Sequence, residues 1–144
     1  MKTCEYKVKH GDKEVKVHLR LTCGGQRKLK EQFEEDTLST LMGAMNEIDK
    51  TVAVFDEALN YKGNDNVITD GEELYDAFVE SGTVGQEEFA KIITDIAVAS
   101  GIIRKDRANS IVHMVEKTYD SMFTGIEEAL DSDSDSVKEE TPTK

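Results

Sequence analysis

Two segments with alternating apolar and polar side chains flank Gly11-Asp12, and they constrain the fold more than any other feature of the chain. Glycine as the first central residue suits a two-residue type II′ turn. If Gly11 and Asp12 form that turn, opposed residues of the two strands have numbers that sum to 23. This register places the apolar side chains of both strands on one face, because strand side chains alternate. The pairs predicted on that face are Cys4–Leu19, Tyr6–Val17 and Val8–Val15.

The opposite face of the predicted hairpin is polar. A two-stranded hairpin is not stable alone, so its apolar face needs helices or another chain to cover it. Its edges are candidate pairing sites, because they present unpaired backbone groups. The pairs predicted on the polar face are Lys9–Glu14, Lys7–Lys16 and Glu5–His18.

The two cysteines are interpreted as small apolar side chains. Cys4 faces Leu19 in this register, whereas Cys23 lies beyond the end of the first strand. Their spacing forms no CxxC motif, and the three histidines are scattered along the chain. We therefore expect no metal site, no redox pair and no cofactor.

The rest of the chain predicts about five helices. Gly24-Gly25 is expected to end the strand, and a short helix to follow over 26–35. Apolar residues then recur at alternating intervals of three and four over 38–59, which indicates one helix, or two broken near Gly43 or Asn46. Further helices are expected from Thr69 or Asp70, over 87–100 and over 104–130. The core-facing side chains predicted for the hairpin and this stripe are Tyr6, Val8, Val17, Leu19, Leu41, Met45 and Phe55.

Length and composition predict one domain of the α+β class, mainly α, over residues 1–130. The last segment, 131–144, reads DSDSDSVKEETPTK and is expected to be a disordered acidic tail. Net charge is −12, which argues against binding to nucleic acid or to anionic membranes. No segment resembles a membrane span or a secretory signal, so we expect a cytoplasmic protein with reduced cysteines.

No pattern in the sequence indicates catalysis. NDNVITDG resembles a calcium-binding loop, but aligning Gly71 with the required glycine puts Ile68 and Ala77 at two oxygen-ligand positions. Phosphate-loop, dinucleotide, GxSxG and HExxH motifs are missing from the sequence. We predict that the protein is not an enzyme; a deep pocket around carboxylates with shifted pKa values would indicate one.

The order of these segments resembles the tail assembly chaperones of long-tailed, siphovirus-type bacteriophages of Gram-positive hosts. The resemblance covers about residues 3–103. It is carried by YKVKHGDKEVKVHLRLTCGGQRKLKEQF, then by TLMGAMNEIDKTVAVFDEAL, and then by EEFAKIITDIAVASGI after a polar loop and a short helix. The matching positions are Gly25, Leu29, Lys30 and Phe33, followed by Phe55, Ala58 and Leu59.

This resemblance implies a protein that binds the tape measure protein, and possibly the major tail tube protein, in the host cytoplasm. It would keep the tape measure protein soluble during tail tube assembly and be absent from the finished virion. Several copies per client imply a homo-oligomer. Exposed partner contacts are expected at Lys7, Lys16, Arg20 and Met42.

Two other hypotheses remain open at the level of the sequence. The first is an acidic protein that imitates DNA or inhibits a DNA-binding partner, which the net charge favours. Basic residues outnumber acidic ones within residues 1–30, and this basic hairpin would spoil a surface of phosphate-like charges. The second is a helical adaptor of general type.

Overall fold

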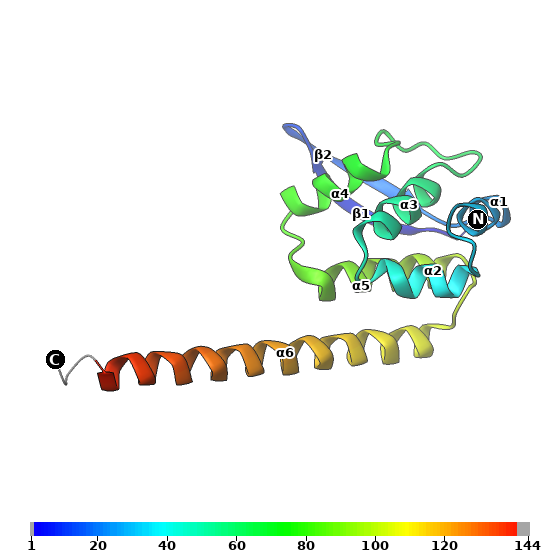
Figure 1. Cartoon of the computed structure of the whole chain (residues 1–144). Coiled ribbons are helices and arrows are strands. Elements are labelled where there is room, and N and C mark those ends of the chain that lie inside the picture. Colours follow the sequence, from blue (N-terminus) through cyan, green and yellow to red (C-terminus); the bar gives the residue numbers. More distant parts are fainter. Residues whose placement is uncertain (1, 141–144) are drawn as a thin grey trace. The chain divides into compact units, whose positions relative to one another are not determined.

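The computed structural model describes residues 2–140, with side chains as far as Leu130. The fold is α+β and mainly α, with an antiparallel hairpin followed by helices (Figure 1). The hairpin strands are β1 (Cys4–His10) and β2 (Lys13–Leu19). The helices are α1 (Cys23–Phe33), α2 (Thr37–Ala44), α3 (Ile48–Leu59), α4 (Gly71–Glu80), α5 (Gly85–Ala99) and α6 (Lys105–Glu140).

The predicted hairpin register is confirmed over its whole length, from Cys4 opposite Leu19 to His10 opposite Lys13. Gly11 has a φ of 66°, as the first central residue of a type II′ turn requires. Helix α4 packs against β1 and helix α3 against β2, so these helices cover the hairpin (Figure 1). The six other predicted core side chains are buried, whereas Tyr6 is half-buried.

Helix α1 begins earlier than the sequence analysis expected. Gly24 and Gly25 do not end the strand; they lie in the first turn of the helix, which starts at Cys23. The Thr22 hydroxyl accepts a hydrogen bond from the Gly25 amide at 3.2 Å and caps this turn. A capping bond satisfies one of the free amides at a helix start, and here it offsets the low helix propensity of glycine.

The apolar stripe over 38–59 is divided between two helices. Helix α2 ends at Ala44 and α3 begins at Ile48, close to the expected break. The buried Thr51 hydroxyl donates to the Ala44 carbonyl at 2.5 Å and holds this turn. Because the break changes the direction of the chain, Leu38 and Ile48 are 46% and 58% exposed instead of facing the core.

An aromatic cluster lies at the centre of the core. Phe55 of α3 packs against Phe78 of α4 and Phe89 of α5, with ring centroids 5.5 and 6.3 Å apart. Tyr6 of β1 meets Phe78 edge-on at 5.4 Å and donates a hydrogen bond to the Asp95 carboxylate. The cluster therefore joins the hairpin to three helices.

Asn66, in the loop between α3 and α4, joins that loop to the hairpin. Its side-chain amide is buried and accepts from the His18 amide at 2.8 Å. It also donates to the His18 carbonyl at 2.8 Å and to the Leu59 carbonyl at 2.9 Å. One edge of β2 is thus paired by a side chain, which leaves less of that edge available to another strand.

The chain divides into two compact units, one ending at Val112 and the other formed by α6 from His113 onward. The sequence predicts one domain over 1–130 instead. From Asp120 to Leu130 every residue of α6 is exposed, so this part of the helix contributes no core.

Helix α6 also continues to Glu140, beyond the expected end at Leu130. Residues 131–140 contain no glycine or proline, and a helix that is already nucleated gains one hydrogen bond for each residue added. The remainder of the expected tail, 141–144, lies outside the described residues.

Candidate functional site

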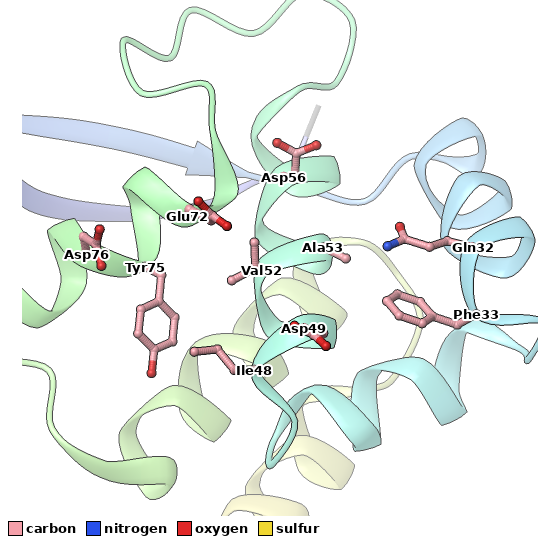
Figure 2. Close-up of a pocket in the computed structure, with 10 residues that line it drawn as sticks. All are labelled: Gln32, Phe33, Ile48, Asp49, Val52, Ala53, Asp56, Glu72, Tyr75 and Asp76. Atoms are coloured by element: carbon pink, nitrogen blue, oxygen red, sulfur yellow. The ribbon is translucent and has the colours of Figure 1, made fainter.

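An open groove of about 740 Å³ lies over helix α3, between α1 and α4. We call it the α3 groove. In Figure 2, α3 runs through the middle, with Phe33 of α1 on one side and Tyr75 of α4 on the other. Its lining consists of Gln32, Phe33, Ile48, Asp49, Val52, Ala53, Asp56, Glu72, Tyr75 and Asp76.

Helix α3 supplies half of this lining because of its periodicity. Residues one, four, five and eight positions after Ile48 share its side of a helix with 3.6 residues per turn. That side carries the aliphatic side chains in the middle of the groove and carboxylates along its length. Its residues are Ile48, Asp49, Val52, Ala53 and Asp56.

The α4 side of the groove is formed around Tyr75, which is half-buried. Its ring stacks on Phe89 with centroids 4.5 Å apart and an interplanar angle of 5°. Phe89 belongs to the aromatic cluster, so the core holds the Tyr75 ring in place. Glu72 and Asp76 lie one turn before Tyr75 and directly after it, and both are exposed.

Gly71 sets the distance between the two helices of the groove. A Cβ atom at this position would lie 2.2 Å from the Val52 carbonyl oxygen and 2.9 Å from the Asp56 amide nitrogen. The Gly71 amide donates to Asp56 Oδ1 at 3.2 Å. The first turn of α4 therefore rests directly on the backbone of α3, and only glycine allows this contact.

Phe33 forms the α1 side and is held by a cation. Lys50 Nζ lies 5.7 Å from the centroid of the Phe33 ring. The same ammonium contacts Glu35 at 2.7 Å and Glu47 at 3.2 Å. The hydrogen bond to Glu35 is the main cause of a raised pKa for Lys50, which keeps the amine charged.

The chemistry of the groove suits the binding of an amphipathic helix. Its apolar middle is flanked by the carboxylates of Asp49, Asp56, Glu72 and Asp76, and no lysine or arginine is among its lining residues. An amphipathic helix with an apolar face and basic flanks matches such a surface. Among the described residues, no three His, Cys, Asp or Glu side chains gather closely enough to hold a metal ion.

The predicted partner contacts lie elsewhere. Lys7 and Lys16 are exposed and face each other across the hairpin, where Lys16 contacts Glu5 at 3.1 Å. Met42 is 45% exposed on α2. Lys7, Lys16 and Met42 are thus accessible, but none of them lines the α3 groove.

Arg20, the fourth predicted contact, is half-buried and holds the fold together. Its Nη1 atom donates to the Lys2 carbonyl at 2.8 Å and to the Ala99 carbonyl at 3.2 Å. These bonds join the start of the chain to the end of α5. Because its guanidinium is occupied in this way, Arg20 is less available to a partner than the sequence analysis expected.

The α3 groove is not predicted from the sequence, because the apolar residues over 38–59, which include Ile48 and Val52, are interpreted there as a single stripe with core-facing side chains. The available signal is the pattern after the break near Asn46, where one side of the helix carries apolar Ile48, Val52 and Ala53 together with acidic Asp49 and Asp56. That pattern indicates a helix side of mixed apolar and acidic character. It does not show that α4 completes the site.

Comparisons of the chain with protein-family models, with curated proteins and with solved structures found no match. Within residues 2–140, no helix is both long and apolar enough to cross a membrane.

Proposed function

We propose that this protein is a chaperone of phage tail assembly. It binds helical segments of the tape measure protein in the host cytoplasm and keeps that protein soluble until tail tube subunits polymerise around it. It acts by contact and not by catalysis, and it is not retained in the virion. The likeness of the hairpin and helical segments to tail assembly chaperones motivates this proposal, and the α3 groove is the observation that supports it best.

The α3 groove has the composition that a helical client requires. A tape measure chain exposes apolar helical faces before assembly, and such faces aggregate unless they are covered. The exposed Ile48 and the half-buried Val52, Phe33 and Tyr75 offer apolar area to one such face. The surrounding carboxylates select helices with basic flanks, and the net charge of −12 keeps the complex dispersed.

The test is co-expression with helix-rich fragments of a tape measure protein, followed by measurement of the soluble fraction of the client. Ile48→Glu puts a charge into the apolar middle of the groove. Val67→Glu is the matched control, because Val67 is 66% exposed in the loop before α4 and is not a lining residue. Wild type and Val67→Glu should keep the client soluble, whereas Ile48→Glu should not.

A double variant separates the groove from the basic face of the hairpin. Lys7→Glu with Lys16→Glu reverses two exposed charges outside the groove. If the client still binds Ile48→Glu but does not bind this double variant, the hairpin and not the α3 groove contacts the client. A client that is equally soluble without the protein would remove the basis of the proposal. Displacement of DNA from a nuclease by the wild-type protein would instead favour the DNA-mimic hypothesis.

A further inference from the structure

Helix α6 from His113 to Leu130 exposes large apolar side chains that no part of its own unit covers. Each of these side chains is at least half exposed. A helix that stands alone in water gains little from propensity and is normally stabilised by packing of its apolar face. The side chains are Met114, Met122, Phe123, Ile126 and Leu130.

Two of these five side chains, Met122 and Ile126, belong to a heptad repeat. Apolar residues recur at gaps of four, three, four and three, which is the a/d pattern of a coiled coil. In this pattern Phe123 and Leu130 occupy e positions, next to the seam, while Met114 lies on the outer face. The seam residues are Val115, Tyr119, Met122, Ile126 and Ala129.

The charged residues of this segment lie away from the seam, with one exception. His113, Lys117, Asp120, Glu127 and Glu128 occupy b, c and f positions on the outer face. Glu116 alone is at an e position. Two copies can therefore meet along the seam without opposing carboxylates, although each chain has a net charge of −12.

The flanks of the seam also fit each other when two copies run in parallel. In a parallel pair, a g residue of one helix neighbours the e residue of the following heptad on the other helix. Phe123 then lies beside Thr118 of the second copy, and Leu130 beside Gly125. Large side chains meet small ones at both flanks of the parallel pair.

We propose that α6 is a self-association helix that pairs in parallel with α6 of a second copy of this chain. The seam from Val115 to Ala129 covers about two heptads, so the association is weak and depends on protein concentration. This proposal concerns α6 alone and does not depend on the identity of the client.

The first experiment measures the mass of the full chain by light scattering and sedimentation over a dilution series. The wild-type protein should move from monomer to dimer as its concentration rises. Met122→Asp with Ile126→Asp should remain monomeric, and Thr124→Asp, at an outer f position, should behave like wild type. Circular dichroism of each variant checks that the hairpin-containing unit still folds.

Three outcomes would overturn the proposal. A wild-type chain that stays monomeric over the whole series would exclude self-association through the α6 face. Association that persists in Met122→Asp with Ile126→Asp would place the contact elsewhere. Loss of association in Thr124→Asp would show a general effect of added charge.

A second experiment tests the orientation of the two helices. Ala129→Cys is introduced with Cys4→Ser and Cys23→Ser, so that the new thiol is the only cysteine. A parallel pair brings the two residues 129 together at the end of the seam and should form a disulfide under mild oxidation, whereas an antiparallel pair holds them at opposite ends. Thr124→Cys in the same background is the control and should form far less. A dimer that gives no crosslink at residue 129 would exclude the parallel arrangement.

Discussion

Substituting Asn66 by alanine removes the three hydrogen bonds that fasten the α3–α4 loop to the hairpin. These bonds join the side-chain amide to the His18 amide, the His18 carbonyl and the Leu59 carbonyl, at 2.8, 2.8 and 2.9 Å. The substitution leaves both backbone groups of His18 without their partner at the edge of β2. Water reaches part of this site, because two of the three bonds are only partly buried.

A buried hydrogen bond contributes a net ~1 kcal/mol, and a group left unpaired out of reach of water costs more. Three such bonds give an expected loss of roughly 2–4 kcal/mol in the free energy of unfolding. For a unit of this size that loss lowers Tm by roughly 8–16 °C. Asn66→Asp should lower the free energy of unfolding by at least as much. Its carboxylate still accepts from the His18 amide, but it has no donor for the two carbonyl oxygens and places a negative charge beside them.

Urea denaturation followed by circular dichroism measures the loss, and hydrogen exchange of the His18 amide shows whether it is local. Asn46→Ala is the matched control, because Asn46 is exposed and its side chain makes no hydrogen bond within the described residues. The control should stay within about 0.5 kcal/mol of wild type. If Asn66→Ala behaved like the control, or if the His18 amide kept its protection, the fastening role of Asn66 would be wrong.

Three further predictions concern the groove and the hairpin. Gly71→Ala should cost ~3 kcal/mol in urea denaturation, because its Cβ meets backbone atoms that cannot move aside, whereas Gly24→Ala, with its nearest contact at 3.8 Å, should be near neutral. At pH 8 a thiol reagent should modify the exposed Cys23 quickly and Cys4 slowly, since burial raises the Cys4 pKa to about 12; Cys23→Ser should remove the fast phase. Burial and the Asp95 hydrogen bond also raise the Tyr6 pKa. The neutral Cys4 thiol and the neutral Tyr6 hydroxyl therefore stabilise the fold below their ordinary pKa values of 9.0 and 10.0, and this stability falls as the pH rises above those values. Tyr6→Phe should show a smaller alkaline loss of unfolding free energy than wild type.

The hairpin could be predicted from the sequence because two independent signals agree on it. The Gly11-Asp12 turn sets the register, and the alternation sorts apolar from polar side chains in that register only. The start of α4 could also be predicted from the sequence, since Asp70 caps this helix as expected. These features depend on residues close together in the chain.

The features that escaped prediction depend on residues far apart in the chain. Asn66 looked like the first position of a failed calcium loop, but its partner His18 is 48 residues away. The α3 groove requires the close approach of Gly71 to Val52, and local patterns carry no information about that distance. Arg20 was likewise predicted to be an exposed cation, but its guanidinium donates to the Ala99 carbonyl at the end of α5.

The two proposed surfaces, the α3 groove and the α6 seam, have different tasks, and together they should bind a client more tightly than one groove alone. One α3 groove offers a small contact area, so a single copy would hold a client helix weakly. Two copies joined through α6 carry two grooves, and a client with successive apolar helices can engage both. The second contact is then intramolecular, so avidity can exceed the affinity of either groove without any new contact, provided the geometry allows both to engage. A weak pairing along α6 suits this task. Once two paired copies dissociate from a client they separate from each other and lose their avidity, so the client becomes free for assembly.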